Sequence, residues 1–89
     1  MVSQPAHFEF TVSGIPLWLM GEYLVELGGQ QVADNTVNGE GWQAHLTRAE
    51  DAQIGSLRVG RVHLQVHGEA WAVEKLRPAL EKKLLRAGA

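Results

Sequence analysis

Residues 62–68 read VHLQVHG, a stretch in which apolar and polar side chains alternate strictly. Successive side chains of a β-strand point to opposite faces of a sheet, so the two valines and the leucine are expected on one face and both histidines on the other. Glycine at position 68 ends the alternation. The stretch therefore predicts a half-buried strand that stops at Gly68.

An amphipathic helix is predicted directly after this strand, over Glu69–Arg86. Its apolar residues recur at helical spacing: Ala72, Val73, Leu76, Ala79, Leu80 and Leu84. Lys75, Lys82 and Lys83 fall on the outer side. Pro78 lacks a backbone N–H, so we expect a kink at this position or a break into two helices.

The N-terminal part predicts a second strand and a second helix. Residues Ala6–Val12 alternate, with His7, Glu9 and Thr11 on the polar side. Leucine and methionine then recur at helical spacing over Pro16–Leu27, and proline suits the first turn of a helix. The glycines that follow Leu27 are expected to end this helix.

The middle of the chain predicts two or three further strands. Gln30–Val37 is the weakest candidate, and Asn38-Gly39 after it predicts a tight hairpin turn. Trp42–Thr47 alternates and forms the partner strand. Arg48–Ser56 is interpreted as a polar connection, although Ile54 and Leu57 could extend a strand into it. The alternation changes phase at Gly60, which predicts a β-bulge there.

Together these elements predict an α+β fold, a two-layer sandwich in which two helices cover one face of an antiparallel sheet. The sheet has four to five strands in the order β-α-β-β-β(-β)-α. A separate strand around Gln53–Val59 would supply the fifth, whereas a lost final strand would make the fold a truncated ferredoxin-like one. The expected core consists of Phe8, Phe10, Trp42, Leu46, Leu64 and Val66.

The last third of the chain also resembles a family of small uncharacterised bacterial α+β domains that end in a strand, a glycine and an amphipathic helix. The residues that carry the likeness are residues 62–68 followed by Trp71, Val73, Leu76, Leu80 and Leu84. The resemblance implies the fold and no activity.

Composition and length indicate one domain over residues 1–89. Apolar residues make up 45% of the 89 residues and charged residues 20%, close to globular averages, so the chain is expected to fold by itself. Without cysteine there is no disulfide or thiolate metal site. The longest apolar stretch, Ile15–Leu27, is too short to span a bilayer and no secretory signal precedes it, so we expect a cytoplasmic protein without membrane contact.

Charge is unevenly distributed along the chain. All eight Lys and Arg residues follow residue 47, although the net charge is −2. Attraction between neighbouring elements explains this pattern better than an external charged partner. Glutamates are interleaved with the basic residues of the second helix, and the polar strand positions carry no aromatic ring, so binding to nucleic acid is not favoured.

All four histidines are expected on the sheet face that the helices leave uncovered. The candidate ligand-binding residues on this face are His7, Glu9, His45, Arg61, His63 and His67. Imidazole and carboxylate groups suit a divalent metal, and His with Arg suits an anion. Cross-strand pairs such as His63 with His45 or His7 depend on the strand order. No catalytic residue, resident metal or cofactor is predicted, because no nucleophile with a neighbouring base is found.

The favoured function is a non-catalytic binding or interaction module that self-associates, as a homodimer, through the open sheet face or an exposed sheet edge. The alternative is a small ligand-dependent or metal-dependent enzyme that uses the histidine-rich face. It would place His7, Glu9 and a neighbouring histidine in an acid-base site.

Overall fold

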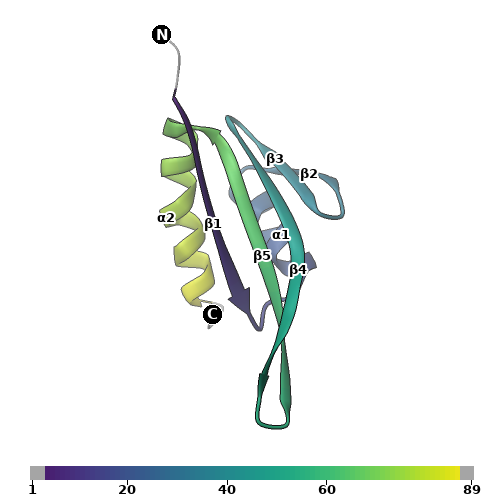
Figure 1. Cartoon of the computed structure of the whole chain (residues 1–89). Coiled ribbons are helices and arrows are strands. Elements are labelled where there is room, and N and C mark those ends of the chain that lie inside the picture. Colours follow the sequence, from purple (N-terminus) through teal and green to yellow (C-terminus); the bar gives the residue numbers. More distant parts are fainter. Residues whose placement is uncertain (1–3, 87–89) are drawn as a thin grey trace.

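The computed structural model describes residues 4–86, which form a five-stranded sheet and two helices (Figure 1). The elements are β1 (Pro5–Ser13), α1 (Leu17–Glu26), β2 (Gln30–Ala33), β3 (Thr36–Gly39), β4 (Trp42–Ile54), β5 (Leu57–Glu69) and α2 (Ala70–Arg86). The expected α+β fold is confirmed, with the order β-α-β-β-β-β-α.

The strands lie in the order β1-β5-β4-β3-β2, and every neighbouring pair is antiparallel. Helix α2 packs against β1 and β5, and α1 packs against β2, β3 and β4. Both helices share one core with the same side of the sheet, so the fold is a two-layer sandwich. Four strands lie between the two helices, which is the five-strand alternative and not the truncated ferredoxin-like one.

The core consists of side chains at alternate positions of the long strands and one stripe of each helix. From the sheet come Phe8, Val37, Trp42, Ala44, Leu46, Val62, Leu64 and Val66, and from the helices Met20, Leu24, Ala72, Val73, Leu76, Leu80 and Leu84. Five of the six expected core residues are buried. Phe10 is half-buried at the edge of the cluster because β1 is the last strand of the sheet.

The two predicted helices form close to their expected limits. Pro16 is the residue before the first turn of α1, and Gly28, with a φ of 105°, follows the C-terminal capping residue Leu27. Helix α2 begins at Ala70 and continues through Pro78, so the expected break into two helices is wrong. Because Pro78 has no N–H, the backbone carbonyl group four residues before it lacks an amide partner. Pro78 is exposed, so water can bind that carbonyl group. Neither helix has the length and apolar character needed to cross a membrane, within the described part of the chain.

The strand boundaries in the middle of the chain differ from the prediction. Gln30–Val37 is not one strand, because a turn at Asp34 and Asn35 divides it into β2 and the start of β3. The next turn lies at Glu40 and Gly41, two residues after the predicted Asn38-Gly39 turn. Gly41 has a φ of 83°, which favours glycine, whereas position 39 requires glycine because a Cβ atom there would overlap the Trp42 ring.

Strands β4 and β5 form one long hairpin, so the predicted polar connection Arg48–Ser56 and the separate strand Gln53–Val59 are wrong. The turn is Gly55-Ser56, and the flanking residues pair across it. A pairing irregularity does lie at Gly60, but the additional residue belongs to β4, where Glu50 and Asp51 face Gly60. The sequence therefore predicts the position of the bulge correctly but places it in β5 and not in β4.

Residues 50–59 of this hairpin extend beyond the rest of the sheet (Figure 1), and we call them the arm. Strand β1 stops pairing with β5 at Arg61, and β3 stops pairing with β4 at His45. Among the described residues, the two strands of the arm pair only with each other. The arm gives the molecule a long axis of 54 Å against 22 Å in the other two directions.

Gly68 offers a test of the packing where the sheet meets the start of α2. A Cβ atom at this position would overlap the carbonyl oxygen of Gly41 and approach Cα of Trp42 to 2.7 Å. We expect Gly68→Ala to lower the free energy of unfolding by about 1–3 kcal/mol, measured by denaturant titration. Gly60→Ala is the matched control, because nothing lies within 4 Å of a Cβ there. Equal stability of the Gly68→Ala variant and wild type would contradict this packing.

Candidate functional site

The candidate site lies on the face of the sheet that no helix covers. Side chains that are directly opposite in an antiparallel ladder share a face, and β5 pairs with both β1 and β4. The register therefore brings alternate residues of three strands onto one polar surface. All four histidines lie on this surface, as the alternation predicts: His7, His45, His63 and His67.

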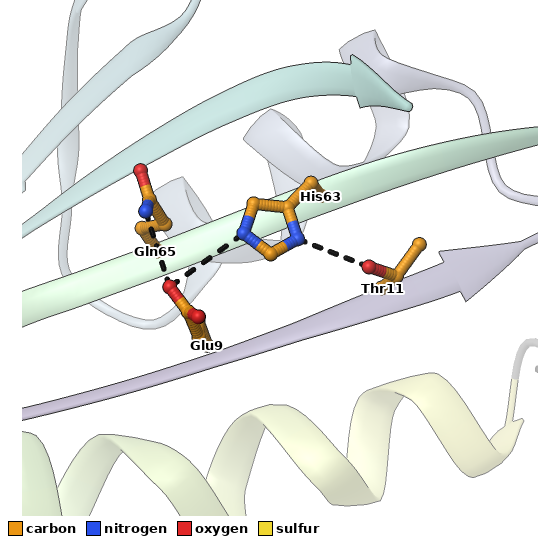
Figure 2. Close-up of polar contacts among 4 residues, drawn as sticks. All are labelled: Glu9, Thr11, His63 and Gln65. Atoms are coloured by element: carbon orange, nitrogen blue, oxygen red, sulfur yellow. Dashed lines mark hydrogen bonds and ion pairs between the residues drawn. The ribbon is translucent and has the colours of Figure 1, made fainter. Parts of the chain in front are cut away.

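A cluster of four polar side chains spans β1 and β5 (Figure 2). His63 lies between two residues of β1: its Nδ1 is 3.0 Å from the Thr11 hydroxyl, and its Nε2 is 3.6 Å from a carboxylate oxygen of Glu9. The side-chain amide of Gln65 donates a hydrogen bond of 3.1 Å to the same Glu9 oxygen. We call these four residues the Glu9–His63 cluster.

The register explains this geometry. Thr11 is directly opposite His63, and Glu9 is directly opposite Gln65, so Glu9 reaches His63 along the diagonal of the ladder. When Nδ1 accepts the proton of the Thr11 hydroxyl, Nε2 carries the proton that faces Glu9. The cluster thus orients one imidazole by two contacts, which is the arrangement that an acid-base pair requires.

Two other histidines form a second group on β4 and β5. The rings of His45 and His67 are stacked, with 5.5 Å between their centroids and 16° between their planes. Nε2 of His45 is 3.2 Å from the Gln43 side-chain oxygen, and the Gln43 amide donates to Asn38 at 2.8 Å. Stacked rings present their faces to each other, so their nitrogens do not converge on one point.

Four of the six candidate ligand-binding residues therefore form two contacting pairs. Glu9 contacts His63, and His45 contacts His67. His7 is directly opposite His67 in the ladder, and Arg61 lies between Ser13 and Ala49. The cross-strand pairs of His63 with His45 or His7 do not form, because His63 faces Thr11 and Thr47.

Metal binding by this face would rest on few protein ligands. Within residues 4–86, no three His, Asp or Glu side chains are grouped closely enough to hold a metal ion. His63 and Glu9 are the two possible ligands that lie nearest each other in the Glu9–His63 cluster. An ion held there would need water or a bound molecule for its other positions.

The electrostatic effect of the cluster is visible at Glu9. The hydrogen bond from the Gln65 amide, with smaller contributions from the charges of His63 and His7, holds the pKa of the Glu9 carboxyl below its ordinary value. Partial desolvation opposes this effect. The carboxylate is thus kept ionised and ready to interact with the imidazole beside it.

A model of archaeal MoaD-like proteins matches residues 8–89. The chain belongs to this family. No curated protein matches the chain.

Membership of the archaeal MoaD-like family agrees in part with the sequence resemblance. The match confirms that the chain belongs to a family of small domains. It does not confirm that this family is bacterial. The family description names no reaction or ligand. The function of the chain must therefore be argued from its own side chains.

Sequence reasoning missed two members of the Glu9–His63 cluster. Thr11 and Gln65 were each assigned to the polar face and to no site. The signal was present in the alternation, since Thr11 follows Glu9 by two residues and Gln65 lies midway between two histidines. Their role depends on the β1–β5 register, which alternation alone does not supply.

The Gln65 contact predicts a measurable change at Glu9. We expect Gln65→Leu to raise the pKa of Glu9 toward its ordinary value, because the carboxylate loses its strongest hydrogen bond. Carboxyl carbon shifts of Glu9 in an NMR pH titration measure this. Gln43→Leu is the control, because Gln43 bonds to Asn38 and His45.

The same shift predicts how stability depends on pH. The pKa of Glu9 is lower in the folded chain than in the unfolded one, so its ionised form stabilises the fold at pH values above the ordinary pKa. This contribution is lost as the pH falls through the folded pKa. Glu9→Gln should therefore flatten the pH dependence of unfolding in the acidic range, and an unchanged pH profile would contradict the assignment.

Proposed function

We propose that this member of the archaeal MoaD-like family is a non-catalytic interaction module that self-associates as a homodimer through the exposed parts of its sheet. The observation that carries the proposal is the arm. Ile54 and Leu57, which are directly opposite each other near its tip, are each 67% exposed.

An isolated two-stranded ribbon has little stability of its own in water. The apolar side chains of the arm lie on one side, since Ala52 pairs with Val59 and Ile54 pairs with Leu57. No helix packs behind this part of the hairpin among the described residues. A second molecule that covers this side would remove apolar surface from water and stabilise the arm.

The sheet edges support the same proposal. Strand β1 is the last strand on its side of the sheet, so within residues 4–86 no strand lies beside the outer N–H and C=O groups of residues 6–13. Unpaired strand edges favour association with another chain. A small domain also gains buried surface by dimerising.

Self-association is tested by size-exclusion chromatography with light scattering from low to high micromolar concentration. We expect the mass to rise from one chain to two. We expect Ile54→Lys to shift this transition to higher concentration, because a charge replaces the exposed apolar group. Val25→Lys is the matched control, since Val25 is an exposed valine on α1, away from the arm.

Two outcomes would contradict the proposal. One is a wild-type chain that stays monomeric at the highest concentration. The other is a dimer whose dissociation constant is the same in wild type and in Ile54→Lys.

We propose as the second candidate a ligand-dependent or metal-dependent activity at the histidine-rich face. The observation that favours it is the contact of His63 with both Glu9 and Thr11, which orients an imidazole beside a carboxylate. An imidazole and a carboxylate held side by side can serve as a general acid and a general base. His7, His45, Arg61 and His67 would contact the remainder of the ligand.

Thermal unfolding with zinc, nickel or inorganic phosphate, each added alone, tests the second candidate. A molecule that binds the folded chain raises its melting temperature. We expect this rise to be lost in His63→Ala and Glu9→Gln and kept in Glu22→Gln, which changes an exposed carboxylate on α1. No rise with any of the three probes would count against a metal or anion site.

A further inference from the structure

The tip of the arm presents two large apolar side chains in a defined geometry. Ile54 and Leu57 flank the Gly55-Ser56 turn and pair across it. Gly55 has a φ of 62°, which suits a tight two-residue hairpin turn with glycine at its first position. The tip is thus a short, apolar projection.

A cleft with apolar walls lies between the two helices, on the side of the sheet that the helices cover. Its volume is about 450 Å³, and its walls include Leu27, Trp42, Trp71 and Leu76. Trp42 is buried and Trp71 is half exposed, with its indole N–H donating 2.9 Å to Glu69. The small side chains of Ala72 and Ala79 leave the space between them open. Apolar clefts with aromatic walls accept apolar side chains of a partner.

The tip cannot reach the cleft of its own chain. Part of the cleft is formed by the β3–β4 turn at Glu40, whereas the tip lies at the other end of the long axis (Figure 1). Two copies that lie antiparallel side by side place each tip beside the cleft of the other copy. Such an arrangement has twofold symmetry and closes without forming a filament.

We propose that the tip of the arm, Ile54 and Leu57, docks in the cleft between α1 and α2 of a second copy of this chain, reciprocally in a twofold dimer. The inference rests on the proposed self-association and names the two surfaces that meet. The docking partner is a second copy of the chain, because the projection and the cleft belong to the same sequence.

One charged residue near each surface has a counterpart of opposite sign near the other. Arg58 is the only charged residue between Ala52 and Gly60. The cleft has Glu26, Glu40 and Lys75 at its border, and Glu26 is already bound by Lys83 at 2.6 Å. Neither Glu40 nor Arg58 has an ion pair within residues 4–86. Docking would let Arg58 of one copy approach Glu40 of the other.

A mixing experiment tests the proposal with two variants of the full chain. Leu57→Asp removes the apolar tip, and Ala79→Glu fills and charges the cleft. Each variant alone is expected to be monomeric at concentrations where wild type is dimeric. An equimolar mixture is expected to form heterodimers, because the intact tip of the Ala79→Glu chain docks in the intact cleft of the Leu57→Asp chain. Analytical ultracentrifugation measures the masses, and circular dichroism verifies that both variants are folded.

Leu85→Asp is the matched control, because Leu85 is 73% exposed on α2 and lies outside the cleft. It should dimerise like wild type. Two outcomes would overturn the docking: either single variant forms dimers like wild type, or the mixture stays monomeric. Neither outcome would overturn the proposal that the wild-type chain self-associates. A wild-type chain that is always monomeric would overturn both.

A charge exchange gives an independent readout. Arg58→Glu and Glu40→Arg should each weaken the dimer by at least about threefold, because each places like charges together. The double variant should recover most of the wild-type affinity. A double variant that is weaker than both single variants would contradict the Arg58–Glu40 contact.

Discussion

Strand β5 pairs with β4 along its length and with β1 from Arg61 to Glu69, and the rest of the structure depends on this double pairing. Directly opposite residues share a face, so the register of β5 determines which face each residue of three strands occupies. A slip of one residue would move His63 and His67 into the core and expose Leu64. The apolar side chains under the two helices make such a slip very unfavourable.

The same register produces the chemistry of the open face. The core side of the sheet is held by burial, whereas on the open side Glu9, Thr11, His63 and Gln65 are held by hydrogen bonds and charge. These contacts are exposed to solvent, so they contribute little to stability. Their effect is to orient one imidazole and one carboxylate, which distinguishes this surface from an ordinary solvated sheet face.

The arm and the cleft follow from the unequal lengths of the elements. Strands β4 and β5 have 13 residues each, whereas β1 has nine and β3 has four, so the hairpin extends past its neighbours and past the helices. The two helices touch each other little, since α1 packs over one part of the sheet and α2 over the other. Apolar surface is left at the tip and between the helices, among other places. In a domain with a small core this surface is a motive for association.

Local sequence patterns were sufficient to predict both helices, the fold class, most of the core and the placement of all four histidines on one face. These features follow from local periodicity, because a spacing of two or of three to four residues assigns each side chain to a face. The same periodicity was less informative at Arg48–Val59, because the irregularity at Glu50 and Asp51 and the Gly55-Ser56 turn interrupt the alternation.

Only the tertiary structure decided which residues meet. Strand order places His63 beside Thr11 and Glu9 and not beside His45 or His7, and it stacks His45 on His67. It also separates the tip of the arm from the cleft by the length of the molecule. The physical reason is that the sheet face of a side chain follows from its neighbours along the chain. The residues that it contacts depend on strand register and on pairings between residues more than 50 positions apart, such as Glu9 with Gln65.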